Sequence, residues 1–312
     1  MDNAERFYFA GLVKRLTIRS YPPTKRANWI PFRNPIKRIV AIGSGSLDPR
    51  KIVNPRKSSR SKSDVNMDEP INIQGATEDM PDEAAAALFQ LQWQLYRKFV
   101  DNNYFYHREV YGQLHRISVD EVVQPFRFLD IACGDARATV ETLRGMRVAH
   151  YYGIDLSSAA LELASKALES LGCPVTLDHR DFIEALRDWP EPVDVAWISL
   201  SLHHLLAPAK LSLMREIRGI VGDSGFFLIY ENASPDGEDR DAWLRRWERQ
   251  NQPLWTAVTT EEYEAMRAHV RENDFTETTS QWQSLGREAG FGRVRELFVA
   301  PTDLFLIYCF QA

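Results

Sequence analysis

Residues 128–137 read Phe-Leu-Asp-Ile-Ala-Cys-Gly-Asp-Ala-Arg, and this stretch decides the fold of the chain. An apolar run ends at Asp130, small residues and one glycine follow, and a helix-like pattern begins at Arg137. This order predicts a strand, a tight turn and the N-terminus of a helix. In sheets covered by helices, a nucleotide-like ligand binds at such a junction because the helix N-terminus presents free N–H groups.

From residue 126 onward, strand-like and helix-like segments alternate regularly. The predicted strands are Phe126–Ala132, His150–Asp155, Pro174–His179, Val193–Leu200, Gly225–Glu231, Arg293–Val299 and Leu304–Phe310. This alternation predicts a parallel sheet with helices on both faces. Only residues 300–303 join the last two strands, which is too short for a parallel crossover, so these strands form an antiparallel hairpin. The predicted fold class is α/β, with a doubly wound, seven-stranded, mostly parallel sheet.

The charge is distributed unevenly along the chain. Residues 1–63 contain 15 Lys and Arg against 3 Asp and Glu, a net of +12. Because the whole chain carries −5, residues 64–312 carry −17. This acidic body repels a phosphate backbone, so a nucleic-acid partner is not expected.

Cysteine usage and hydropathy indicate the compartment. The three cysteines form no CxxC pair, which argues against a disulfide framework or a zinc site. No apolar run reaches the roughly 18 residues of a membrane span, and the N-terminus lacks the apolar core of a secretory signal. We expect a cytoplasmic protein without a membrane partner.

Composition divides the chain into three parts. Residues 1–66 are basic and Ser-rich, and we expect a disordered extension, an organelle transit peptide, or a segment upstream of a true start at Met67. The last of these is favoured because the composition shifts sharply at Met67. Residues 67–120 are predicted to form an N-terminal helical cap, and residues 121–312 the ligand-binding domain. That domain contains a helical insertion at 232–278, with Trp243, Trp247, Trp255 and Tyr263.

Four linked stretches resemble the class I S-adenosylmethionine-dependent methyltransferases of the Rossmann-like, small-molecule type, over about residues 80–312. The first is residues 129–136, where Ala132 and Ala136 stand at two positions that are usually glycine and only Gly134 remains. Small residues are needed there because the backbone approaches the methionine end of the ligand.

The other three stretches follow the next three predicted strands. The resemblance implies that Asp155 accepts hydrogen bonds from the ribose hydroxyls and that Asp181 and Phe182 contact the adenine. The fourth stretch, residues 194–205, ends below the transferring methyl group. The expected cosubstrate is therefore S-adenosyl-L-methionine, bound by Asp130, Ala132, Gly134, Asp155, Leu156, Asp181, Phe182 and Ser199.

Other interpretations stay open. Each acidic residue alone can be a helix cap, but Asp130, Asp155 and Asp181 stand at successive strand ends with spacings of 25 and 26 residues, which favours a shared ligand. An NAD-dependent oxidoreductase is disfavoured because Gly-x-Gly-x-x-Gly is absent. A non-catalytic or regulatory S-adenosylmethionine-binding protein is a further alternative, and a nucleic-acid methyltransferase would need the basic tail.

The catalytic candidates are His203, His204 and Glu231. Neighbouring residues usually point to different sides, so the histidine pair is not expected to bind a metal ion. One of the two imidazoles can act as a general base near neutral pH. Glu231 ends the fifth strand, next to the insertion. The expected reaction is in-line transfer of a methyl group to an O, N or C nucleophile of a small-molecule acceptor.

Overall fold

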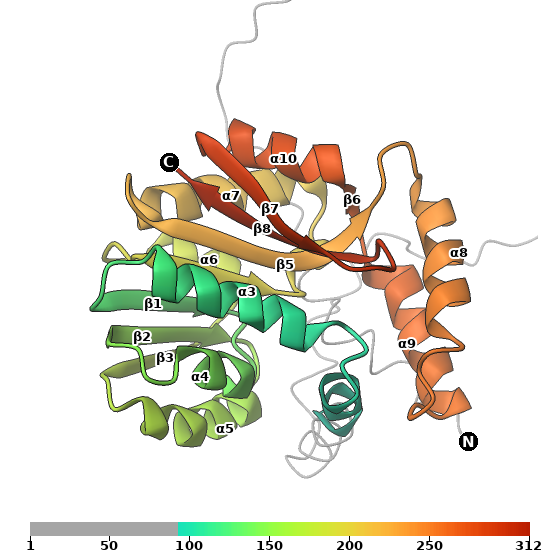
Figure 1. Cartoon of the computed structure of the whole chain (residues 1–312), viewed down its shortest axis with the longest axis horizontal. Coiled ribbons are helices and arrows are strands. Elements are labelled where there is room, and N and C mark those ends of the chain that lie inside the picture. Colours follow the sequence, from blue (N-terminus) through green and yellow to red (C-terminus); the bar gives the residue numbers. More distant parts are fainter. Residues whose placement is uncertain (1–92) are drawn as a thin grey trace, which may run out of the picture. The chain divides into compact units, whose positions relative to one another are not determined.

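We describe residues 93–312 of a computed structural model of the chain (Figure 1). The predicted extension at residues 1–66, and the part of the predicted cap before residue 93, lie outside the described residues. Within the described part, no helix has both the length and the apolar character that a membrane span requires.

The core of the protein is one mixed sheet. Its strands are β1 Phe126–Ile131, β2 Val148–Asp155, β3 Val175–His179, β4 Val195–Ser199, β5 Phe226–Ser234, β6 Glu277–Thr278, β7 Arg293–Val299 and β8 Phe305–Gln311. They are ordered β3-β2-β1-β4-β5-β8-β7, and β6 pairs only with the end of β5. Strands β1 to β5 are parallel, and β8 is antiparallel to both β5 and β7. The predicted α/β sheet and its antiparallel hairpin are confirmed.

Helices cover both faces of the sheet, as the alternation predicted (Figure 1). They are residues 93–101, α3 His107–Asp120, α4 Arg137–Leu143, α5 Ser158–Leu168, α6 Phe182–Arg187, α7 Ala207–Val221, α8 Arg240–Asn251, α9 Thr260–Asn273 and α10 Thr279–Glu288. Successive strand residues point to opposite faces. Phe128 therefore packs in the core under α3, α4 and α5, whereas Leu129 packs in the core under α6, α7 and α10.

Strand β5 is longer than the sequence predicts. It continues past Glu231 to Ser234, and Ala233 and Ser234 pair with the short strand β6. Two tryptophan side chains also hold the end of β5. The indole N–H of Trp243 donates to the carbonyl of Ala233 at 3.0 Å, and that of Trp282 donates to the carbonyl of Asn232 at 3.1 Å. The predicted insertion at 232–278 thus begins and ends in sheet, with α8 and α9 between.

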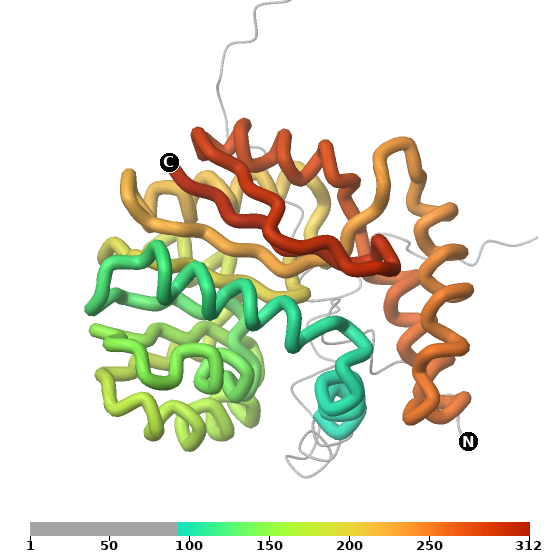
Figure 2. The backbone as a smooth tube through the Cα atoms, viewed as in Figure 1, coloured from blue at the N-terminus to red at the C-terminus, as the bar shows by residue number. Residues whose placement is uncertain are grey.

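The insertion packs against the segment that precedes α3. The ring of Phe99 stacks on Phe105 at 4.5 Å and meets the edge of Trp255 at 4.7 Å. Lys98 forms an ion pair with Glu262 at 2.6 Å. Figure 2 shows both segments beyond the carboxyl ends of the parallel strands. Aromatic contacts thus join residues 93–105 and α8–α9 into one layer at that edge.

Candidate functional site

The turn after β1 has three residues in left-handed backbone conformation. Their φ angles are 57° at Ala132, 56° at Gly134 and 54° at Ala136. A Cβ atom costs about 1 kcal/mol or more in this conformation, so Ala132 and Ala136 carry backbone strain that Gly134 does not. The Cys133 N–H donates to the carbonyl of Ile154 at 3.0 Å, which ties the turn to the end of β2.

Asp155 holds this turn from the neighbouring strand. Its carboxylate accepts from the Gly134 N–H at 2.8 Å and from the Ser157 N–H at 2.8 Å. The cap of α5 is Ser157, whose hydroxyl accepts from the Ala160 N–H at 3.2 Å. Asp155 is therefore not the helix cap. Each carboxylate oxygen keeps a further lone pair, which is what two ribose hydroxyls require.

Asp181 caps α6, because its carboxylate accepts from the Ile183 N–H at 2.7 Å. The cap uses one of about four lone-pair sites, so an adenine amino group can still be accepted. The Phe182 side chain packs in the core under α6 and is only 5% exposed. Leu156, by contrast, is one of the few large apolar side chains that are exposed, and it lies next to Asp155. The ribose and adenine assignments stay predictions.

Asp130 lies buried below the turn, at 2% exposure. The Tyr151 hydroxyl donates to it at 2.6 Å. Burial nevertheless raises the pKa of Asp130 to about 7, with a smaller contribution from Asp155. Ser199 ends β4 on the next strand, and its side chain is hydrogen-bonded to Tyr111. A cationic ligand above the turn would favour the ionised form of Asp130.

We expect Asp130→Asn to stabilise the ligand-free protein at neutral pH. A carboxyl group whose pKa is raised in the folded state from 3.8 to about 7 costs stability progressively as pH rises through that range. Asparagine is uncharged and can still accept from Tyr151. Its advantage over the native protein should be on the order of 1–2 kcal/mol larger at pH 8 than at pH 5, measured by urea unfolding. A difference that does not depend on pH would show that Asp130 ionises freely in the fold.

The three catalytic candidates meet at the carboxyl ends of β4 and β5. Glu231 is fully buried, and one carboxylate oxygen accepts from the Ser201 N–H at 2.7 Å and the Leu202 N–H at 2.6 Å. Its other oxygen lies 2.7 Å from Nδ1 of His203. Glu231 therefore orients both the loop after β4 and the first imidazole.

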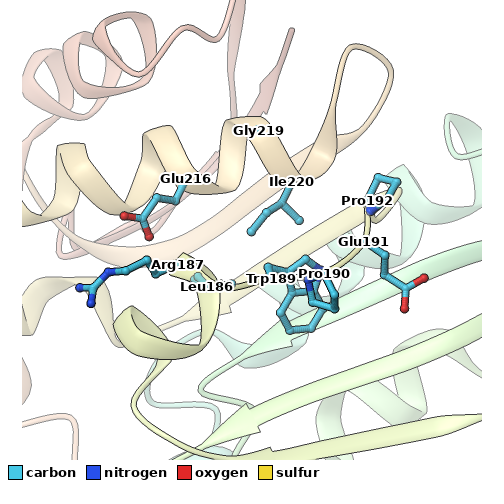
Figure 3. Close-up of a pocket in the computed structure, with 9 residues that line it drawn as sticks. All are labelled: Leu186, Arg187, Trp189, Pro190, Glu191, Pro192, Glu216, Gly219 and Ile220. Carbon is cyan, nitrogen blue, oxygen red and sulfur yellow. The ribbon is translucent and has the colours of Figure 1, made fainter.

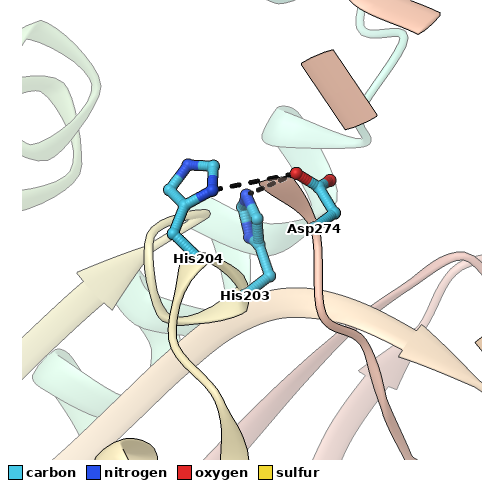
Figure 4. A group of neighbouring side chains, drawn as sticks. All are labelled: His203, His204 and Asp274. Atoms are coloured by element: carbon cyan, nitrogen blue, oxygen red, sulfur yellow. Dashed lines mark ion pairs between the residues drawn. The ribbon is translucent and has the colours of Figure 1, made fainter. Parts of the chain in front are cut away.

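A fourth residue, Asp274, completes what we call the polar cluster: His203, His204, Glu231 and Asp274. The carboxylate oxygen Oδ1 of Asp274 lies 3.8 Å from Nε2 of His203 and 3.8 Å from Nδ1 of His204 (Figure 4). Asp274 follows α9, and the sequence carries no signal that pairs it with residues 70 positions earlier. The main chain fixes this contact, because the Phe275 N–H donates to the His203 carbonyl at 2.7 Å.

The expectation that the two histidines point apart is wrong. They lie in a 3₁₀ turn, Leu202–His204, and their ring centroids are 4.1 Å apart. Both rings direct a nitrogen toward Asp274, as Figure 4 shows. The side-chain alternation of an extended strand does not apply after β4 has ended.

The electrostatics of the polar cluster follow from burial and close charges. Burial lowers the pKa of His203, but the carboxylates of Asp274 and Glu231 outweigh this effect and hold it above the usual value. Burial raises the pKa of Glu231, yet His203 and the two backbone N–H groups bring it below normal. Burial raises the pKa of Asp274 to about 6. Burial and mutual interaction thus shift the pKa values of all three groups, as is common at functional sites.

Tyr230 and His107 are two further buried polar residues. The Tyr230 hydroxyl donates to the Phe105 carbonyl, so it ties β5 to the segment before α3. His107 is 4% exposed, and neither of its ring nitrogens has a hydrogen-bond partner within residues 93–312. Its ring lies parallel to that of Tyr111 at 6.1 Å and edge-on to that of Tyr230 at 6.0 Å. Burial lowers the pKa of His107 to about 4, so the ring is neutral.

A surface pocket lies elsewhere, between α6 and α7 (Figure 3). Its walls are Leu186, Arg187, Trp189, Pro190, Glu191, Pro192, Glu216, Gly219 and Ile220. These residues precede β4 or end α7, so the pocket opens at the amino end of β4. It is therefore separate from the turn at Asp130 and from the polar cluster.

Comparison with known proteins identifies the domain. A family model described as a methyltransferase domain matches residues 128–225, from β1 to the end of the loop before β5. No curated protein matches the chain closely enough to count as a relative.

Three solved structures illustrate the similarity of the fold. The S-adenosylmethionine-dependent methyltransferase SibL is 19% identical with a TM-score of 0.45, over 64% of this chain and 54% of that chain. A putative O-methyltransferase from Nostoc punctiforme is 17% identical with a TM-score of 0.47, over 64% and 55%. An O-methyltransferase family protein from Burkholderia thailandensis is 15% identical with a TM-score of 0.48, over 71% and 69%. The chain thus spans little more than half the length of the first two.

The family match covers the turn at Asp130 and the acidic residues that end β2 and follow β3. The sheet order contains the antiparallel hairpin that the short link at residues 300–303 predicted. The comparisons therefore show that residues 128–225 match a methyltransferase domain.

Proposed function

We propose that this protein transfers the methyl group of S-adenosylmethionine to an O, N or C nucleophile of a small-molecule acceptor. One observation carries the proposal: the turn at Asp130 and the polar cluster lie at the same edge of neighbouring strands. Asp130 on β1 is paired with Trp197 on β4, and Ser199 at the end of β4 with Tyr230 on β5. A cosubstrate above β1 therefore directs its reactive end toward the residues that follow β4.

The protein itself forms no covalent bond in this reaction. An electron pair of the acceptor forms the bond to the methyl carbon while the carbon–sulfur bond breaks, and the sulfonium becomes the neutral thioether of S-adenosylhomocysteine. The positive charge already activates the donor, so the protein contributes alignment and exclusion of water. A protonated acceptor must also lose a proton, and we assign that activation to the polar cluster.

Within the cluster, His203 has the geometry for this role. The Nδ1–H donates to Glu231, so in the neutral ring Nε2 carries a lone pair. The Nε2 atom lies 3.8 Å from Oδ1 of Asp274. Glu231 acts by holding the tautomer and the ring orientation.

We further propose that residues 93–105 and α8–α9 cover the acceptor as a lid. The lid is rich in aromatic side chains, and the Ala257 N–H donates to the Tyr104 hydroxyl at 2.8 Å across its two parts. A long insertion after a strand's carboxyl end is typical of substrate-covering segments. The aromatic side chains of the lid and the acidic body both favour a small organic acceptor over a nucleic acid.

Calorimetric titration tests the proposal. We expect the full chain to bind S-adenosylhomocysteine with micromolar affinity and NADH not at all. We also expect labelled methyl groups of S-adenosylmethionine to enter the small-molecule fraction of a cell extract. Binding without any transfer would identify a non-catalytic S-adenosylmethionine-binding protein, and binding of NADH alone would contradict the assignment of the cosubstrate.

A further inference from the structure

We propose that His203, His204 and Asp274 form a binding site for a first-row divalent cation such as Zn²⁺ or Fe²⁺. The three side chains offer Nε2, Nδ1 and Oδ1, and these atoms all lie within 4.8 Å of one another. Both imidazole nitrogens are 3.8 Å from the carboxylate oxygen. Ligands at about 2.0–2.2 Å from an ion lie roughly 3–4 Å apart, so small side-chain rotations close the site.

The carboxylate of Asp274 has one oxygen in use and one without a partner. Its Oδ2 accepts from the Asn232 side chain at 2.8 Å, which fixes the orientation of the group. Its Oδ1 is buried and has no hydrogen-bond partner among the described residues. A buried oxygen in this state costs free energy unless a donor or a cation occupies the space before it.

The tautomer of His203 also indicates a place for a cation next to Oδ1 of Asp274. Glu231 accepts from Nδ1, so Nε2 of the neutral ring presents a lone pair toward Oδ1 of Asp274. Repulsion between these two atoms is relieved by a positive species, which is either a proton on Nε2 or a metal cation. A carboxylate that holds the distal nitrogen of a ligating histidine is also the usual support of a metal site.

The charges around the cluster leave room for a cation. Lys210 is fully buried but is bound to Glu277 at 2.8 Å and to the Phe275 carbonyl at 2.5 Å. Arg240 donates to the main-chain carbonyl of Asp274 at 2.9 Å, not to its carboxylate. Within the described residues, Lys210 and Arg240 thus act on the carboxylates of Glu231 and Asp274 by charge, without donating a hydrogen bond to either.

The ligand atoms indicate which cations fit. Two imidazole nitrogens and one carboxylate oxygen suit Zn²⁺, Fe²⁺, Co²⁺ or Ni²⁺, whereas Mg²⁺ and Ca²⁺ prefer oxygen ligands alone. Three protein ligands also leave coordination positions open, as in catalytic rather than structural sites. If methyl transfer takes place as proposed, an acceptor oxygen bound at an open position would lose its proton more easily. Only this role rests on the proposed function; the binding of the cation does not.

Metal titration of the tag-free, chelator-treated full chain tests the site. We expect one Co²⁺ per chain with visible ligand-field absorption, one Zn²⁺ by calorimetry, and no saturable binding of Mg²⁺. The substitutions Asp274→Asn and His204→Gln should each weaken Zn²⁺ binding at least about tenfold. His150→Gln, which changes a histidine on β2 away from the cluster, should leave Zn²⁺ affinity unchanged.

Two readouts separate this proposal from the proposed function. Asp274→Asn should bind S-adenosylhomocysteine as the native chain does, and its thermal unfolding should show that it is folded. If the native chain binds no transition-metal ion, or if both cluster variants bind Zn²⁺ like the native chain, the site is refuted and a proton on His203 bridges the carboxylates instead. If the native chain does not bind S-adenosylhomocysteine, that result contradicts the methyltransferase proposal and not the metal site.

Discussion

Replacing Glu231 by alanine is expected to lower the free energy of unfolding by about 3–5 kcal/mol and to abolish methyl transfer. The carboxylate is fully buried and accepts from the N–H groups of Ser201 and Leu202 and from Nδ1 of His203. Alanine leaves all three donors in a cavity without a partner. The loop after β4 then loses its anchor, and the first imidazole loses its fixed tautomer.

Glu231→Gln is the matched variant for this prediction. Its amide oxygen can still accept from the two backbone N–H groups, but its NH₂ group opposes Nδ1 of His203 instead of accepting from it. We expect it to recover much of the stability in urea unfolding while turnover stays low. Full turnover in Glu231→Gln would show that the orientation of His203 does not matter for the reaction.

Asp155→Ala is expected to weaken the binding of S-adenosylhomocysteine at least about tenfold, or about 1.4 kcal/mol. The substitution removes the carboxylate that we propose as the acceptor for the ribose hydroxyls. It also releases the N–H groups of Gly134 and Ser157, which the carboxylate holds at 2.8 Å each. The turn after β1 thus loses both its ligand contact and its preformed shape.

Calorimetry with a control on the neighbouring strand checks this prediction. Asp178 on β3 pairs with Arg180 at the surface, so Asp178→Ala should leave the affinity within about twofold. If Asp155→Ala binds S-adenosylhomocysteine as tightly as the native chain does, Asp155 does not bind the ribose. An equal loss in both variants would indicate a general effect of acidic residues at this edge rather than a specific contact.

Local patterns were sufficient to predict the sheet. The apolar runs that end at Asp130 and Asp155 became β1 and β2, and the short link before Phe305 became the turn of the antiparallel hairpin. Strand periodicity and the minimum length of a parallel crossover are properties of a few neighbouring residues, so they are visible without the fold. The small residues at Ala132 and Ala136 likewise marked the turn after β1, whereas its left-handed backbone became visible only in the structure.

Contacts between distant segments were not visible in this way. The extension of β5 to Ser234 depends on β6 and on two tryptophans from different helices. The sequence left open whether Asp181 caps a helix, and the hydrogen bond from the Ile183 N–H shows that it caps α6. A strand or helix that packs against a segment from dozens of residues away does not alter the sequence pattern of that segment. Such a contact therefore cannot be read from the neighbouring residues.

The sequence alone determined the succession of strands and helices along the chain and predicted the strand-end acids as a ligand site, because periodicity, turn size and strand-end acids are local properties. The tertiary structure decided how the histidines are used. It placed Asp274 of the insertion before both imidazoles, within 3.8 Å of each, and Glu231 behind the first of them at 2.7 Å. That arrangement depends on how a 3₁₀ turn, a strand end and a helix end pack together, and only the folded chain sets these relations.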